Sequence, residues 1–181
     1  SFLERGYLVF PGLLADEACA LRTEFDRLLD DGGQQGPAAD WNAVDTGGAE
    51  LVPATDGEGR AIPGRVMKVQ AAALGSGAVL SLLASPKVVS RVRGLYLALA
   101  QENTEHVDVF GTKFFPMWPG GRSVSWHQDC HYFGTASPKI VSCGVYVDAA
   151  DATNGCLRVV PGSHARGALP HSPGAGDLAN G

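Results

Sequence analysis

Apolar residues in the first part of the chain follow helical spacing in one stretch and crowd together in another. The aromatic and β-branched stretch 2–10 ends at a Pro-Gly pair, which predicts a strand followed by a turn. Beyond it, Asp16 can cap a helix whose apolar positions recur every three or four residues as far as the glycines at 32–33. We expect the apolar stripe of this helix to pack on a sheet.

The middle of the chain changes character twice. Residues 31–64 are rich in Gly, Ala, Asp and Pro and show little periodicity, which predicts a long surface loop that could serve as a lid. Residues 65–70 predict a strand. After the glycines at 75–77 the pattern predicts two helices, the second opening with Ser85 as its cap and Pro86 at its first helical position.

Short apolar stretches separated by turn signals dominate the second half, and each predicts a strand. They are residues 107–117, 123–128, 140–147 and 156–160. Helices followed by strands predict the α+β class, and short, closely spaced strands favour a double-stranded β-helix, or jelly roll, with the N-terminal helices packed on its sheet. Because a jelly roll normally has eight strands, we expect this single domain of residues 1–181 to lack C-terminal strands.

Composition narrows the classes of partner. The chain has 181 residues, of which 45% are hydrophobic and 18% charged, as expected for one globular domain. A net charge of −5 without any cluster of Lys and Arg argues against nucleic acid. The chain has neither an apolar run of about 18 residues nor a leader pattern, so we expect a cytoplasmic protein without a membrane partner, acting on a small molecule as a monomer or homodimer.

Four cysteines are dispersed along the chain, at Cys19, Cys130, Cys143 and Cys156. They form no CxxC pair and are too few for a disulfide scaffold. We therefore predict reduced and mostly buried thiols.

His127 and Asp129 carry the candidate chemistry. Residues i and i+2 of a strand project from the same face, so the two side chains could hold one ion. A neutral imidazole and a carboxylate are two parts of the facial triad that suits Fe(II) and leaves positions open for co-substrate and oxygen. The spacing alone is a weak signal, and a capped turn or a core histidine are the alternatives.

Several motifs around this pair share their residue types, order and spacing with one enzyme family. They are Trp126 to Phe133, Asp148 to Leu157, Pro161 to His164, Gly6-Tyr7 and Lys68 to Gln70. Together they resemble the phytanoyl-CoA dioxygenase family of Fe(II)- and 2-oxoglutarate-dependent oxygenases. The resemblance covers nearly the whole chain and implies that His127 and Asp129 are iron ligands.

The resemblance also implies a third ligand, a histidine on a later strand, followed by an arginine that pairs with the far carboxylate of 2-oxoglutarate. His164 belongs to a Pro-Gly-Ser-His turn that the family carries in addition to its ligand histidine. His171 lies between prolines in a loop-like segment, and no arginine follows it. We therefore expect the third ligand beyond Gly181.

Other site residues are implied less sharply. Lys68 matches a lysine near the co-substrate in the family, with a solvated lysine at a strand edge as the alternative. Lys113 alternates with apolar residues and could direct its ammonium group toward a carboxylate, but a surface lysine fits as well. Val145 falls where some members carry a bulkier side chain in the wall of the co-substrate pocket.

Three aromatic residues adjoin the proposed metal pair. Trp126, His131 and Tyr132 are candidates for substrate contact, and core packing is the alternative for each.

The implied activity is hydroxylation of an aliphatic C–H bond, or its desaturation or cyclisation, using O2 while 2-oxoglutarate becomes succinate and CO2. The implied cofactors are Fe(II) and 2-oxoglutarate, with ascorbate as a reductant in vitro. Related halogenases replace the carboxylate ligand by Gly or Ala, so the presence of Asp129 disfavours halogenation. A catalytically silent binding protein on the same jelly roll is the alternative from another class.

Overall fold

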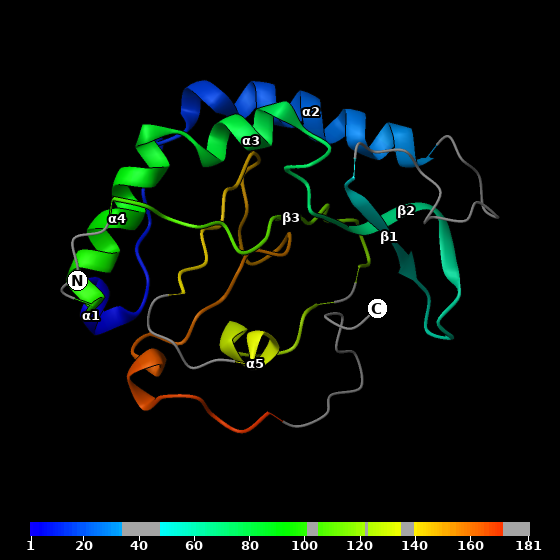
Figure 1. Cartoon of the computed structure of the whole chain (residues 1–181). Helices are drawn as coiled ribbons and strands as arrows, with labels where there is room; N and C mark the ends of the chain where they lie inside the picture. The colour runs from blue at the N-terminus through cyan, green and yellow to red at the C-terminus, as the bar shows by residue number, and fades with distance from the viewer. Residues whose placement is uncertain (34–47, 101–104, 122, 135–139, 172–181) are drawn as a thin grey trace. The chain divides into compact units, whose positions relative to one another are not determined.

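The computed structural model describes residues 1–33, 48–100, 105–121, 123–134 and 140–171 (Figure 1). Its elements in chain order are α1 (Phe2–Arg5), α2 (Ala15–Gly33), β1 (Glu50–Thr55), β2 (Ala61–Gln70), α3 (Gly77–Leu83), α4 (Pro86–Ala100), β3 (Lys113–Phe114), α5 (Asp129–Phe133) and the 3-10 helix η2 (Ser163–Arg166). The chain divides into two units, described separately below. The sheet unit comprises 14–88 and 108–121, and the terminal unit comprises 1–13, 89–107 and 122–181.

A three-stranded antiparallel sheet, in the order β1-β2-β3, forms the centre of the sheet unit. In its register, Leu51 of β1 lies opposite Val69 of β2, and Val69 lies opposite Phe114 of β3. The prediction of a loop over 31–64 is therefore wrong for the hairpin, while residues 34–47 lie outside the described part. The register shifts beside Pro53, and this irregularity broke the alternation that would have marked the strands in the sequence.

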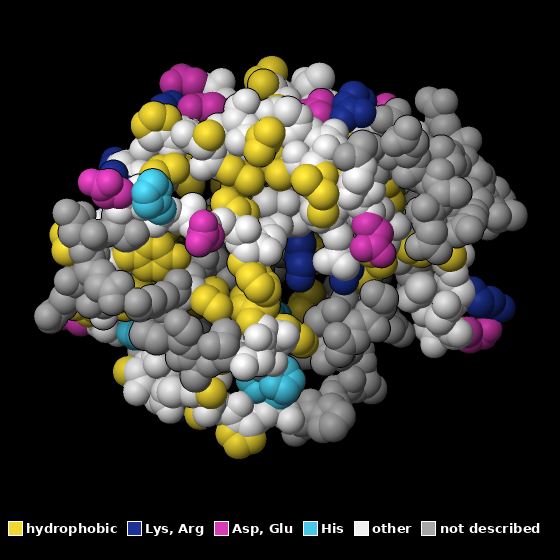
Figure 2. All heavy atoms as spheres, viewed as in Figure 1, with side chains coloured by type: hydrophobic (Ala, Val, Ile, Leu, Met, Phe, Trp, Pro, Cys, Tyr) yellow, Lys and Arg dark blue, Asp and Glu magenta, His cyan; other side chains and the backbone are white. Residues whose placement is uncertain are grey.

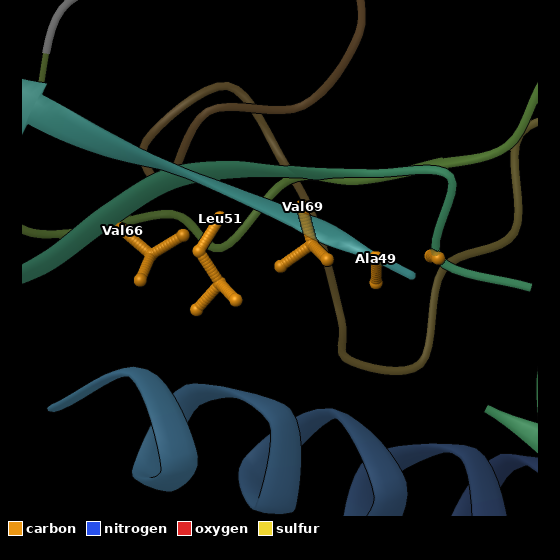
Figure 3. Packing of buried hydrophobic residues seen from close by; sticks show 5 residues of the cluster. Ala49, Leu51, Val66 and Val69 are labelled. Atoms are coloured by element: carbon orange, nitrogen blue, oxygen red, sulfur yellow. The ribbon is translucent and has the colours of Figure 1, made fainter. Parts of the chain in front are cut away.

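One face of this sheet packs on α2. Figure 3 shows the side chains of the buried cluster pointing toward that helix. The cluster consists of Ala49, Leu51, Val66, Val69 and Ala72, with Leu29 of α2 and Phe114 packed against it. The ring of Phe25, also on α2, stacks on Phe114 with their centroids 4.0 Å apart. The predicted packing of this helix on a sheet is thus confirmed, although Asp16 lies in its first turn instead of capping it.

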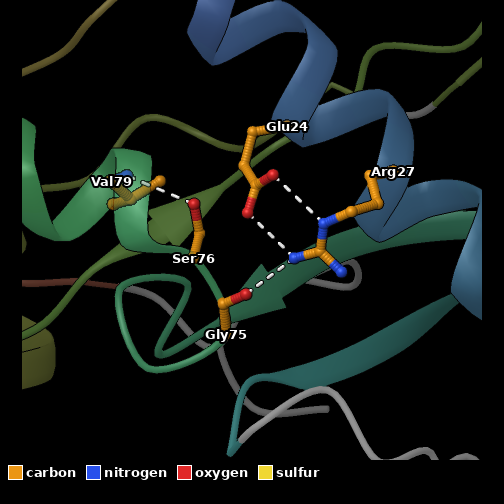
Figure 4. A network of polar contacts seen from close by, with 5 residues as sticks. All are labelled: Glu24, Arg27, Gly75, Ser76 and Val79. Carbon is orange, nitrogen blue, oxygen red and sulfur yellow. Dashed lines mark hydrogen bonds and ion pairs between the residues drawn. The ribbon is translucent and has the colours of Figure 1, made fainter.

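Polar contacts tie α2 to the start of α3 (Figure 4). Arg27 donates hydrogen bonds of 2.8 Å to the carboxylate of Glu24 and to the carbonyl of Gly75. Next in the chain, the hydroxyl of Ser76 caps α3 by accepting from the Val79 amide. The two predicted helices after 75–77 are confirmed, the second beginning at Pro86. In the part of the chain that the structure describes, no helix is long and apolar enough to cross a membrane.

The terminal unit begins with a short helix where a strand was predicted over 2–10. Helix α1 ends at Gly6, whose φ of 79° lies in the left-handed region that glycine adopts without strain. A side chain at this position would also collide with the imidazole of His164. The amide of Gly162 donates a hydrogen bond of 2.9 Å to the carbonyl of Arg5, so η2 is anchored beside α1.

The predicted strands of the second half are largely absent among the described residues. Only Lys113 and Phe114 of the stretch 107–117 join a sheet, and no strand forms in 123–128, 140–147 or 156–160. Large apolar side chains in these stretches are exposed instead, and Figure 2 shows hydrophobic side chains at the surface. The alternating pattern reports a tendency to pair, but a strand also needs a neighbouring strand. The α+β class is consistent with this architecture, whereas a jelly roll is not shown.

All four cysteines carry free thiols, as predicted. Their expected burial is wrong for Cys19 and Cys143, which are exposed, while Cys130 and Cys156 are partly buried. Cys19 lies on the outer side of α2, where burial is not needed to keep a helix amphipathic.

Candidate metal centre

The side chains of His127 and Asp129 face each other in the terminal unit. Nδ1 of His127 lies 2.7 Å from the carbonyl oxygen of Ser125. A carbonyl can only accept, so Nδ1 carries a proton, and in the neutral ring Nε2 carries the lone pair. Nε2 in turn lies 3.4 Å from Oδ1 of Asp129. The exposed fractions of the two side chains are 27% and 47%, so solvent reaches both.

The backbone brings the pair together in a way that the sequence did not predict. Both residues were expected on one strand, but Asp129 is the first residue of α5. Gln128 is extended, with φ −115° and ψ 131°, and stands at the N-cap of that helix. The two side chains converge because the chain passes from extended to helical conformation at Gln128.

The donor atoms fit a divalent metal. Histidine nitrogen and carboxylate oxygen bind such ions at about 2.0–2.2 Å, so two ligands at right angles lie about 3 Å apart. The observed 3.4 Å between Nε2 and Oδ1 is close to this separation. In the described ranges no group of three or more His, Cys, Asp and Glu side chains could hold a metal ion. The two donors that His127 and Asp129 supply, an imidazole nitrogen and a carboxylate oxygen, are of the types that suit Fe(II).

Ser142 completes the surroundings of the carboxylate. Its hydroxyl donates a hydrogen bond to Oδ2 of Asp129, while the other oxygen, Oδ1, faces His127. Bonds of this kind orient metal ligands and tune their basicity. This contact could not be predicted, because a serine within the apolar stretch 140–147 has no spacing relationship to the motif.

Of the three aromatic residues predicted beside the pair, Tyr132 contacts His127 directly. The ring of Tyr132 meets that of His127 edge to face at 5.1 Å, and meets that of His131 at 5.4 Å. Trp126 is 63% exposed, and the guanidinium group of Arg158 lies 5.7 Å from the centre of its ring. Tyr132 and His131 thus take part in packing around the proposed ligand, and their contact with substrate stays a prediction. The proximity of Arg158 to Trp126 was not foreseen.

The two later histidines are engaged elsewhere in the terminal unit. Nε2 of His164 lies 3.1 Å from the carbonyl of Leu3. Nε2 of His171 accepts a hydrogen bond of 2.9 Å from the Gln128 amide, and its Nδ1 lies 2.9 Å from the Leu169 carbonyl. Both ring nitrogens of His171 therefore already have partners.

The predicted co-substrate lysines lie in the sheet unit. Lys68 and Gln70 are two apart in β2, and Gln70 lies opposite Lys113 of β3, so the three side chains share the sheet face opposite Val69. Lys68 is only 2% exposed, which excludes a solvated lysine, whereas Lys113 is exposed. Burial, and then the charge of Lys113, lower the pKa of Lys68, while Glu50 partly opposes the shift.

Val145 belongs to the terminal unit and is 40% exposed. Its placement in a co-substrate pocket stays a prediction.

The family model of phytanoyl-CoA dioxygenase (PhyH) matches residues 2–178, and the chain therefore belongs to this family. A curated relative, the probable alpha-ketoglutarate-dependent hypophosphite dioxygenase of Stutzerimonas stutzeri, is 28% identical to this chain over 87 residues. The matched stretch covers 48% of this chain and only 28% of the relative's length. No solved structure matches the chain significantly.

Proposed function

We propose that this chain carries the catalytic centre of an Fe(II)- and 2-oxoglutarate-dependent dioxygenase that oxidises a small molecule. The observation that carries the proposal is the approach of His127 Nε2 to Asp129 Oδ1, 3.4 Å apart, with Nδ1 of His127 engaged by the Ser125 carbonyl. Membership of the PhyH family and the name of the relative support it. When bound, iron would activate O2 for the oxidation, which is coupled to loss of CO2 from 2-oxoglutarate.

The contribution of the two ligands is to hold the ion in a fixed orientation. The Ser125 carbonyl keeps the His127 proton on Nδ1, and Ser142 holds Oδ2 of Asp129. Neither ligand needs to act as a general acid or base in this scheme. We propose that the third ligand, a histidine, lies beyond Gly181, because both ring nitrogens of His171 are occupied and His164 is bonded to α1.

For the co-substrate we propose the sheet face that carries Lys68 and Lys113. Two ammonium groups on one face favour a dianion. Burial, and then the charge of Lys113, lower the pKa of Lys68, and a carboxylate bound there would offset the repulsion between the two ammonium groups. Val145 is proposed as a further contact of the co-substrate.

The reaction that we propose is oxidation of an aliphatic C–H bond by hydroxylation, with desaturation or ring closure as variants. Trp126, His131 and Tyr132 are the proposed substrate contacts. The relative is named for hypophosphite, so hypophosphite belongs among the compounds tested beside acyl thioesters and amino acids. Fold alone does not select among these, because one scaffold supports many substrates.

The test is a succinate-release assay with Fe(II), 2-oxoglutarate and ascorbate, run across this panel of compounds. We expect succinate to form in step with an oxidised product and to depend on O2. The same assay with His127→Ala should yield none. Succinate formation that persists unchanged in that variant would show that the oxidation does not use this centre.

The alternative functions predict different results. A catalytically silent binding protein would bind a compound of the panel without forming succinate. A halogenase would need an open coordination position in place of the carboxylate, and Asp129 occupies it. We further propose a double-stranded β-helix for the whole domain, a cytoplasmic location, and a monomer or homodimer.

A further inference from the structure

Gln128, the residue between the two proposed ligands, is held by a segment about forty residues later in the chain. Its side-chain Nε2 donates a hydrogen bond of 3.0 Å to the Gly167 carbonyl, and its Oε1 accepts a hydrogen bond of 2.7 Å from the Leu169 amide. Its backbone amide donates a hydrogen bond of 2.9 Å to Nε2 of His171. Both ends of the side chain and the backbone N–H are thus bonded to residues 167–171.

His171 is itself fixed in place. Because Nε2 accepts from Gln128, the ring proton is on Nδ1, which donates to the Leu169 carbonyl at 2.9 Å. The His171 ring stacks on that of His131 with centroids 4.0 Å apart and planes inclined by 7°. The backbone amide of His131 donates a hydrogen bond of 3.0 Å to the Gln128 carbonyl, so His131 is linked both to Gln128 and to His171. These five residues, Gln128, His131, Gly167, Leu169 and His171, form the Gln128 clamp.

The position of the clamp determines the direction of the carboxylate. Gln128 is where the chain changes from extended to helical, and Asp129 follows it directly. A rotation about ψ of Gln128 would swing Asp129 and α5 relative to His127. Hydrogen bonds to both ends of the Gln128 side chain oppose this rotation. They therefore hold Nε2 of His127 and Oδ1 of Asp129 at their observed separation.

We propose that the Gln128 clamp presets the geometry of the metal pair and that His171 is a positioning residue, not a ligand. The proposal rests on the function proposed above, because it gives His127 and Asp129 the role of ligands. In metal sites, partners of this outer kind contribute about ten- to hundred-fold to metal affinity.

The key variants are His171→Phe and His171→Gln. Phenylalanine keeps a flat ring that can stack on His131 but removes both nitrogen contacts. Glutamine loses the stacking but can offer an acceptor to the Gln128 amide. Gln128→Met, of similar length without hydrogen-bonding groups, tests the clamp from its other side. The matched control is His164→Phe, the same exchange at a histidine bonded to Leu3 and outside the clamp.

Two measurements on the whole chain separate the clamp from the metal. Hydrogen exchange without metal measures protection of the Gln128 and Leu169 amides. Titration with Co(II) alone, followed by its visible absorption, measures affinity. We expect His171→Phe and Gln128→Met to lose amide protection and about ten-fold or more in Co(II) affinity. His171→Gln should recover part of both, and His164→Phe should leave the Co(II) affinity unchanged.

Three results would overturn the proposal. Unchanged Co(II) affinity in His171→Phe, with protection of Gln128 lost, would show that the clamp exists without positioning the ligands. An equal loss in His164→Phe would indicate general destabilisation. If His127→Ala and Asp129→Ala bound Co(II) as well as the wild type does, the two residues would not be ligands and the proposed function would be wrong. The clamp would then have no ligands to position, even if the Gln128 amide stayed protected.

Discussion

The hydroxyl of Ser142 donates a hydrogen bond to Oδ2 of Asp129, thirteen residues earlier in the chain. This bond leaves Oδ1 as the carboxylate oxygen that faces His127. A carboxylate held at one oxygen has less freedom to turn away from a metal at the other. Ser142 therefore joins an otherwise irregular stretch of chain to the proposed metal pair.

Removing this hydroxyl should weaken metal binding without disturbing the fold. We predict that Ser142→Ala lowers Co(II) or Fe(II) affinity by about ten-fold, the lower end of the range for outer partners of metal ligands. Isothermal titration would measure the affinity. Ser123→Ala, at an exposed serine near the motif, is the control and should bind as the wild type does. Equal affinities for Ser142→Ala and the wild type would show that the Ser142 hydroxyl does not support metal binding.

Loss of either proposed ligand should have a larger effect on metal than on stability. We predict that His127→Ala and Asp129→Ala abolish detectable metal binding and turnover. Their circular dichroism should match the wild type, because side chains exposed by 27% and 47% contribute little to core burial. Thermal unfolding followed at the same wavelength would expose any loss of structure. Turnover at the wild-type rate in either variant would contradict the assignment.

The sequence predicted the elements whose signals are local. Helix α4 begins at Pro86 as expected, because a proline at the first helical position and a preceding serine are both signals within a few residues. Strand β1 and the first residues of β2 were missed because a register shift at Pro53 interrupts the alternation, whereas the strand predicted over 65–70 forms the rest of β2. Helix α1 was missed because its aromatic and aliphatic residues favour a strand, and its stop depends on Gly6.

The site was predictable only in part, for the same reason. His127 and Asp129 were named from a short motif, but their expected placement on one strand was wrong, and the change of conformation at Gln128 brings them together. Ser142 and His171 act across 13 and 43 residues of chain, respectively, and such pairings leave no local pattern. A single sequence reveals the donors of a site more readily than the contacts that orient them.

The stability of the sheet unit should depend on the buried cluster against α2. Leu51 is 2% exposed and belongs to this cluster. We predict that Leu51→Ala lowers the free energy of unfolding by about 2–5 kcal/mol, from lost burial and the cavity left behind. Urea denaturation followed by circular dichroism would measure it. Leu80→Ala is the control, since Leu80 on α3 is 58% exposed and its loss should cost less than about 0.5 kcal/mol. Similar losses in the two variants would show that the cluster is not the source of stability.

The buried ammonium group of Lys68 should make stability depend on alkaline pH. Burial and the charge of Lys113 lower its pKa below the ordinary value of 10.5, so between the folded pKa and 10.5 the unfolded chain binds more protons than the folded one. Stability then rises with pH across that window and is lost again as pH falls through the folded pKa. Lys68→Met removes this titration, so the wild type should gain stability relative to the variant as pH rises toward 10.5. Lys87→Met is the matched control with the opposite sign, because hydrogen bonds from Lys87 to Glu17 and Asp16 raise the pKa of Lys87. Urea unfolding at several pH values would measure the free energy of unfolding of the wild type and of both variants. If the difference in this free energy between the wild type and Lys68→Met stayed constant up to pH 10.5, Lys68 would titrate in the folded protein as it does in the unfolded chain.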